Sequence, residues 1–150
     1  MPVTTTLTLA NLIDRTGLDV LSHLEREVTI PVIDGLQAQG DLIVIPHADL
    51  PGVLRYLPWR EVPQTGIEVL RSAAGGNPHT LVADPGTCQW TTGVNDPRGL
   101  AIGALTTSGV AYLIHPEHGG TGIAPGTYVI RRQRERGGRP EQMASRLVAD

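Results

Sequence analysis

The chain lacks the features that mark secreted or membrane proteins. Its single cysteine, Cys88, has no partner for an internal disulfide, which excludes a small disulfide-stapled framework. No apolar run approaches the roughly 20 residues needed to cross a bilayer. The amino terminus has no positively charged segment followed by an apolar one, so we expect no signal peptide. These absences predict a cytoplasmic protein without membrane contact.

Phenylalanine and lysine are also absent, and all twelve basic residues are arginine. The core must therefore be built from Leu, Ile, Val and Ala, with Trp59, Trp90 and three tyrosines as the bulky side chains. A net charge of −3 argues against bulk binding to nucleic acid, because such binding depends on many cationic contacts with phosphates.

Positive charge gathers in one short segment, "RRQRERGGR" (131–139). Arg131, Arg132 and Arg134 are candidates for binding a small anion or an acidic protein partner. The same residues are also typical of a solvated strand end, and the sequence leaves both interpretations open.

The first 27 residues differ in pattern from the remainder. Between residues 7 and 27, leucines and isoleucines recur near helical spacing, and Gly17 interrupts the run. We therefore predict a helical amino-terminal extension over residues 1–27, formed by two short helices or by one that breaks at Gly17. These helices would cover an open sheet edge or mediate self-association into a homo-oligomer.

Residues 28–150 read as one β-rich domain. Short apolar runs alternate with Gly, Pro, Asn and Asp at the interval of about 8–12 residues that all-β folds show. The predicted strands cover residues 28–33, 41–46, 66–72, 79–84, 87–92, 100–107, 110–115 and 127–133. "TTSGVA" (106–111) predicts a tight hairpin between two of them. The fold class is mainly β, a compact β-barrel or β-sandwich with a short helical amino-terminal segment.

Three histidines are the candidate site. His115 and His118 lie three apart at the end of a strand, in "YLIHPEHGG" (112–120), and His79 begins another strand. If these two strands are neighbours, the three imidazoles meet at one end of the domain. Three histidine ligands with an open fourth position are typical of a catalytic zinc site, so we predict a divalent metal, with Zn²⁺ first.

Glu117 lies between two of these histidines and is the candidate catalytic residue. It would act as general base toward a metal-bound water, or hold an imidazole in one tautomer. The alternative is that the histidines belong to an ordinary polar turn, because an H-x-x-H pattern outside a helix specifies no geometry. His47 follows a strand and is interpreted as a loop residue.

The order of the motifs resembles a family of small, mostly uncharacterised bacterial and phage proteins. The resemblance rests on "QGDLIVIP" (39–46), a glycine-rich loop ending in histidine (75–79), "YLIHPEHGGTGIAPGTYVIRRQRE" (112–135) and a closing "LVAD" (147–150). It covers about residues 39–150 and implies a compact β-rich domain with no settled activity.

The resemblance maps the family's histidines onto His79, His115 and His118, and its "QRE" motif onto residues 133–135. Asn77 stands where the family's loop has another histidine, which reduces four histidines to three. Asn77, Gln133 and Glu135 are candidates to hydrogen-bond to the metal ligands and orient them, without contacting the ion. Glu135 would reach the histidines if the strand 127–133 neighbours the strand 110–115; otherwise Arg134 and Glu135 would make salt bridges.

The leading hypothesis is a metal-binding β-domain with a three-histidine site, which as an enzyme would be a metal-dependent hydrolase. The alternative is a non-catalytic structural or interaction module of phage or conflict-system origin. A third interpretation is a metal-free barrel that binds a small molecule between Trp90 and Tyr112. The sequence leaves open whether the domain is an enzyme.

Overall fold

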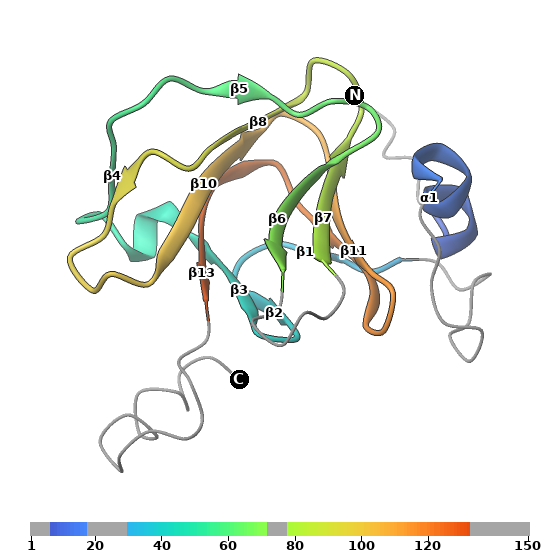
Figure 1. Cartoon of the computed structure of the whole chain (residues 1–150), viewed down its shortest axis with the longest axis horizontal. Coiled ribbons are helices and arrows are strands. Elements are labelled where there is room, and N and C mark those ends of the chain that lie inside the picture. Colours follow the sequence, from blue (N-terminus) through green and yellow to red (C-terminus); the bar gives the residue numbers. More distant parts are fainter. Residues whose placement is uncertain (1–6, 18–29, 72–77, 133–150) are drawn as a thin grey trace, which may run out of the picture.

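The part of the chain that the structure describes forms a β-sandwich of two mainly antiparallel sheets, with a short helix packed on its outside (Figure 1). The computed structural model describes residues 7–17, 30–71 and 78–132. The helix is α1 (Leu9–Thr16), and η1 (His47–Asp49) is a 3₁₀ turn. The strands are β1 (Val32–Ile33), β2 (Gln37–Gln39), β3 (Leu42–Pro46), β4 (Leu54–Arg55), β5 (Arg60–Glu61), β6 (Ile67–Arg71), β7 (Pro78–Ala83), β8 (Cys88–Thr91), β9 (Val94–Asn95), β10 (Ala101–Thr107), β11 (Ala111–His115), β12 (Gly119–Ile123) and β13 (Gly126–Arg132).

One sheet has five strands in the order β1-β12-β11-β7-β6, and the other has six in the order β2-β3-β13-β10-β8-β5. Among the described strands of these two sheets, the pairings are antiparallel except that of β1 with β12. A separate two-stranded pair, β4-β9, is also antiparallel. The sheets do not close into a barrel, so the sandwich form of the predicted fold class is confirmed.

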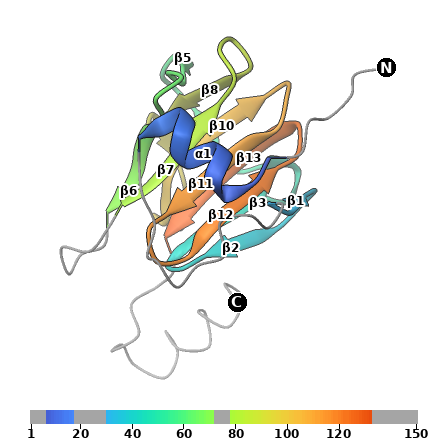
Figure 2. The same ribbon diagram turned by 90° about the vertical axis from the view of Figure 1, so that its right-hand side faces the viewer.

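Strand β11 explains why the five-stranded sheet is apolar on both faces. Ala111 and Leu113 point between the sheets, whereas Tyr112 and Ile114 join a second cluster with Leu12 of α1. Figure 2 shows α1 lying across the outer face of this sheet. A strand covered on both sides needs apolar residues at every position, which accounts for the continuous run "AYLI".

Helix α1 is capped at both ends, and it ends at Gly17, where the sequence analysis expected a break. The Thr8 hydroxyl accepts a hydrogen bond from the backbone of Asn11, whose side chain accepts one from the backbone of Thr8, a reciprocal cap. Gly17 ends the helix with φ 72°, a left-handed conformation that costs glycine little. Leu12 of this helix is fully buried, and the burial of its side chain stabilises the fold by about 2 kcal/mol. The predicted helix after Gly17 lies outside the described residues.

The predicted hairpin at "TTSGVA" is wrong. Strands β10 and β11 belong to different sheets, and residues 108–110 carry the chain from one sheet to the other. In this connection the Ser108 N–H donates to the Thr87 carbonyl at 2.8 Å. A Ser-Gly pair indicates a change of direction, but it does not determine which strands pair.

Strand β12 was not predicted, because glycine is depleted in strands. Its glycines allow close approach of other segments. A Cβ on Gly122 would lie 2.9 Å from Val32 Cγ2 and 3.1 Å from the Pro31 carbonyl oxygen, so β1 can pair here only with a glycine.

Candidate metal centre at the histidine end of the sandwich

Strand pairing and side-chain alternation bring His79 and His115 together. In β7, Leu81 and Ala83 face the space between the sheets, and His79 lies two residues before Leu81 on the same face. In β11, His115 follows Leu113 on the inward face in the same way. The two strands pair with Ile114 opposite Thr80, so both rings extend the core at one end. His79 is 1% and His115 4% exposed, and their ring centroids lie 4.4 Å apart.

The β11–β12 hairpin adds His118 to this pair. Residues 116–118 form the turn, and Gly119 has φ +82°, which lets the chain reverse. The ring centroid of His118 lies 4.5 Å from that of His115 and 6.2 Å from that of His79. His118 and Glu117 are exposed, so solvent reaches the cluster from the hairpin side.

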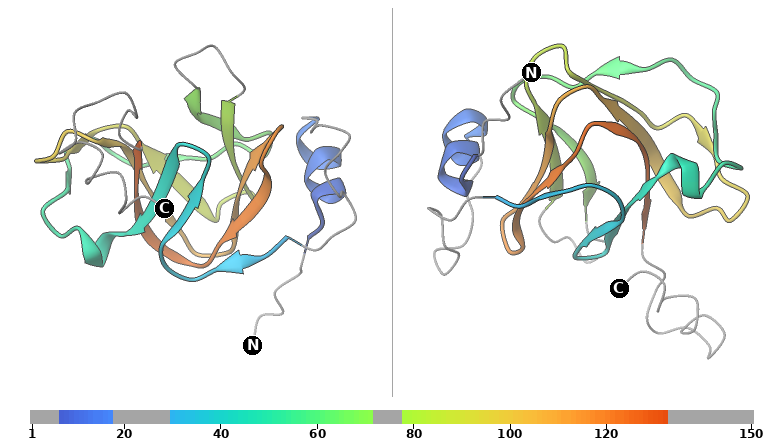
Figure 3. Two further views of the ribbon diagram at one scale, coloured as in Figure 1. Left: turned by 90° about the horizontal axis from the view of Figure 1, so that it is seen from below. Right: turned by 180° about the vertical axis from the view of Figure 1, so that it is seen from behind.

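The turn between β2 and β3 supplies the other polar groups at this end. Figure 1 and the view from below in Figure 3 place this turn near the start of β7 and the β11–β12 hairpin. Gln39 Oε1 lies 2.8 Å from His79 Nδ1, and Asp41 Oδ1 lies 3.2 Å from His79 Nε2. Neither oxygen was predicted as part of the site, although both residues lie in the quoted "QGD" motif.

Gly40 lies between these residues and determines how closely the hairpin approaches. Its φ is +59°, and a Cβ at this position would be 2.8 Å from His118 Nε2 and 3.3 Å from His79 Cε1. Both the backbone conformation and the space therefore require a glycine.

The two buried histidines have different hydrogen-bond partners. Besides its contacts with Gln39 and Asp41, His79 is held in a desolvated position. Burial first and the neighbouring His115 second lower the pKa of His79 to about 4, against the raising effect of Asp41. His115 Nδ1 instead accepts from the backbone N–H of Glu117 at 3.0 Å and of His118 at 3.3 Å. As the side chains stand, no three His, Cys, Asp or Glu residues within the described ranges form a group able to hold a metal ion.

Comparison with known proteins places the chain in a family. A family model described as "Domain of unknown function (DUF8820)" matches residues 38–133. The chain belongs to this family. No curated protein and no solved structure was found to match the chain. The DUF8820 region contains Gln39, Asp41 and the three clustered histidines, and it begins after α1.

The structure describes two of the three arginines that were predicted to bind an anion or an acidic partner. Arg131 lies in β13 and forms a two-pronged salt bridge with Asp96, at 2.8 Å from Nη2 and 3.0 Å from Nε. Arg132 is exposed, and Arg134 lies outside the described residues. Arg131 is therefore engaged within the fold, and Arg132 alone of the three is described as solvent-facing.

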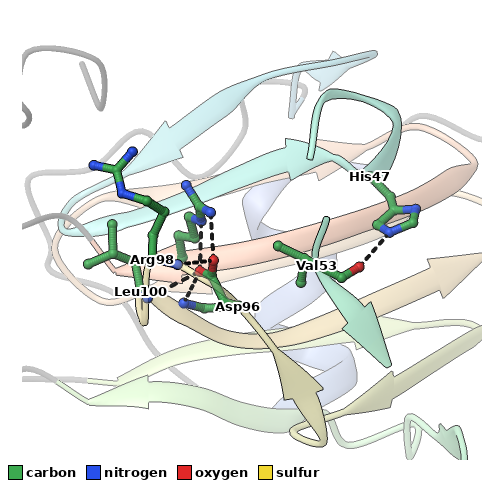
Figure 4. A network of polar contacts seen from close by, with 7 residues as sticks. His47, Val53, Asp96, Arg98 and Leu100 are labelled. Atoms are coloured by element: carbon green, nitrogen blue, oxygen red, sulfur yellow. Dashed lines mark hydrogen bonds and ion pairs between the residues drawn. The ribbon is translucent and has the colours of Figure 1, made fainter. Parts of the chain in front are cut away.

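Asp96 is the centre of a satisfied network (Figure 4). Besides Arg131, it accepts from the backbone N–H groups of Arg98, Leu100 and Ala101 at 2.8–3.1 Å. Burial alone would raise the pKa of the Asp96 carboxyl, but these hydrogen bonds and the charge of Arg131 hold it below its usual value. His47, also shown in Figure 4, contacts the Val53 carbonyl through Nε2 at 2.8 Å, which agrees with its interpretation as a loop residue.

The remaining site predictions concern residues outside the described ranges, and one of them assumed a strand pairing that the structure does not have. Asn77, Gln133 and Glu135 are not among the described residues. Strand β13 pairs with β10 and β3 rather than with β11, so the pairing that would have brought Glu135 to the histidines does not form.

The structure also does not support a small-molecule site between Trp90 and Tyr112. Tyr112 packs beneath α1, whereas Trp90 lies between the sheets, so the two cannot line one cavity. Among the described residues, no helix is long and apolar enough to span a membrane.

Proposed function

We propose that this DUF8820 protein binds a divalent transition-metal ion, zinc being the first candidate, at the histidine end of the sandwich. The observation that carries the proposal is the 3.2 Å separation of His79 Nε2 and Asp41 Oδ1. In a tetrahedral site with bonds of about 2.0–2.1 Å, neighbouring ligand atoms are about 3.3 Å apart. The two atoms are therefore already spaced as two ligands of one ion.

His118, on the β11–β12 hairpin, completes the donor set. The His118 ring is exposed, so it can turn about its side-chain bonds toward the ion without disturbing the core. Imidazole and carboxylate donors together suit zinc and other late first-row ions. The fold has a core of its own, so the ion would serve the site rather than hold the domain together.

Hydrolysis is the reaction class that this arrangement favours. An ion held by three protein donors would supply a water nucleophile near neutral pH. Glu117 lies exposed on the same hairpin as His118 and would be the general base at this end. Esters, amides and phosphoesters are the substrate classes to test.

Elemental analysis of the full chain tests metal binding. The protein is prepared without a histidine tag, dialysed against excess zinc and then against buffer. We expect about one ion per chain in the wild type, and loss of that ion in the His79→Gln and Asp41→Asn variants. His47→Gln is the matched control, because His47 contacts Val53 at another part of the fold. Equal zinc content in the wild type and in His79→Gln would contradict the proposal.

A second candidate function is a non-catalytic interaction module. It is favoured by an exposed apolar row in and after β4, where Leu54 is 61%, Tyr56 68% and Leu57 46% exposed. Large apolar side chains exposed together indicate an interface, and a second copy of the chain is the partner that can be tested directly. Sedimentation velocity from low to high concentration should show a dimer that Tyr56→Glu abolishes. A monomer throughout would exclude self-association.

A further inference from the structure

We infer that Gln39 is a positioning residue that holds His79 with its proton on Nδ1, so that Nε2 presents a lone pair toward Asp41. His115 is held in the opposite tautomer and shapes the hairpin instead of binding the ion. The inference deepens the proposed function, because it selects among the donors. The tautomers themselves are a property of the metal-free chain.

The orientation of the Gln39 amide follows from its neighbours. Gln39 is 4% exposed, and one end of its amide lies 3.2 Å from the Leu113 carbonyl oxygen and 3.3 Å from Thr121 Oγ1. A carbonyl oxygen only accepts, so the NH₂ group must be the end that faces Leu113. The amide oxygen then faces His79.

The orientation of the amide determines the tautomer of His79. The 2.8 Å contact between Gln39 Oε1 and His79 Nδ1 is a hydrogen bond only if a proton lies between them. The amide oxygen carries none, so the proton belongs to Nδ1. Metal-binding histidines are commonly held in this way, with one ring nitrogen donating to an oxygen and the other directed at the ion.

In this tautomer, His79 Nε2 and Asp41 Oδ1 are both hydrogen-bond acceptors, and they face each other. A neutral imidazole has a single proton, and an ionised carboxylate has none, so the two atoms at 3.2 Å lack a proton to share. A cation between them removes the repulsion. The Asp41 side chain is 46% exposed, so an ion from solvent can reach it, whereas the His79 side chain is only 2% exposed.

His115 shows the opposite arrangement. Its Nδ1 accepts from two backbone N–H groups, those of Glu117 and His118. A backbone N–H can only donate, so Nδ1 keeps its lone pair and the proton of neutral His115 lies on Nε2. Binding an ion through Nε2 would move that proton to Nδ1, against both N–H groups. His115 thus fixes the turn that carries His118, and the donors to the ion are His79, His118 and Asp41.

Long-range ¹H–¹⁵N correlation spectra of the metal-free, ¹⁵N-labelled full chain at pH 7.5 test the inference. We expect His79 as the Nδ1–H tautomer and His115 as the Nε2–H tautomer. In Gln39→Leu, His79 should change to the Nε2–H form, which can donate to Asp41. Gln39→Glu loses the donation to the Leu113 carbonyl but keeps an acceptor for Nδ1–H, so the proton should stay on Nδ1.

Gln37→Leu is the matched control. Gln37 lies on the same face of β2, is 6% exposed, and likewise bridges the sheets, with its amide donating to the Gly122 carbonyl at 3.0 Å. It should leave the His79 tautomer and zinc affinity unchanged, whereas Gln39→Leu should weaken zinc binding about 10–100-fold.

The outcomes separate the inference from the proposed function. An Nε2–H or doubly protonated His79 in the wild type would overturn the inference, and so would an unchanged tautomer in Gln39→Leu. If both tautomers are as expected but the wild type binds no zinc, Gln39 keeps its assigned role and the metal-binding function falls. Should Gln39→Leu fail to fold, the wild-type and Gln39→Glu spectra still decide the tautomers.

Discussion

Two carboxylates of this protein face a basic side chain, and they differ in how completely they are satisfied. Asp96 is 3% exposed at its side chain, and its oxygens receive both prongs of Arg131 and three backbone N–H groups. Asp41 is 46% exposed at its side chain, and its contact within the described residues is the single approach to His79 Nε2. The oxygens of Asp96 are fully used as hydrogen-bond acceptors, whereas those of Asp41 still have acceptor sites that face solvent.

This difference separates a stabilising pair from a candidate site. A buried carboxylate whose acceptor sites are all used cannot bind a ligand as well. Removing it leaves its partner's charge buried and unpaired. A half-exposed carboxylate beside a buried imidazole costs the fold little and can take up a cation. We therefore assign Asp96 to stability and keep Asp41 as the proposed ligand.

Removing each carboxylate should give the largest contrast. Asp96→Ala leaves Arg131, 13% exposed at its side chain, without its partner, which we expect to cost about 3–5 kcal/mol. Asp41→Ala should change the free energy of unfolding by about 1 kcal/mol or less, because the carboxylate is half exposed. Urea unfolding of the metal-free variants measures both. Similar losses in the two variants would remove the distinction.

Gly40→Ala probes the histidine end without replacing a proposed ligand. The left-handed conformation should cost about 1–2 kcal/mol, and the new Cβ should push His118 away. Gly86→Ala is the control, because Gly86 has φ +78° with no atom within 4 Å of an added Cβ. Both should lose the stability that the left-handed conformation costs, Gly40→Ala somewhat more because of its contacts, but Gly40→Ala alone should bind zinc more weakly in a calorimetric titration. Equal zinc affinity in the two variants would argue against His118 as a ligand.

The pH dependence of stability should reveal the Asp96 network. Its folded-state pKa lies below the ordinary value of 3.8, so the unfolded chain takes up the proton first as pH falls. The contribution is therefore complete above that ordinary value and is lost as pH falls through the folded pKa. The stability difference between the wild type and Asp96→Asn should therefore narrow in acid. Chemical unfolding at a series of pH values measures this smaller effect.

The fold was predictable to the extent that burial leaves a repeating pattern. Each of the eight predicted strands overlaps an observed one, because both the inter-sheet core and the cover of α1 demand apolar runs. The two-residue strands β4, β5 and β9 were not predicted, because they are too short to show a period. Strand pairing was the weaker part, as the connection between β10 and β11 shows, because local turn residues do not encode which sheet receives the next strand.

The candidate site was half predictable for a related reason. His79 and His115 could be placed by alternation once their two strands were supposed to be neighbours. Gln39 and Asp41 lie about 40 residues from His79 along the chain, on a turn of the opposite sheet. No local pattern connects them to the histidines, so only the packing of the two sheets shows the contact.

A double-mutant cycle in zinc affinity tests the central claim most directly, that Asp41 and His79 share an ion. Calorimetric titrations would compare the wild type, Asp41→Asn, His79→Gln and the double variant. We predict that each single change weakens binding at least about 10-fold and that the double variant loses far less than the sum, because the pair acts on one ion. Additive losses, or zinc binding that survives both changes, would contradict the account.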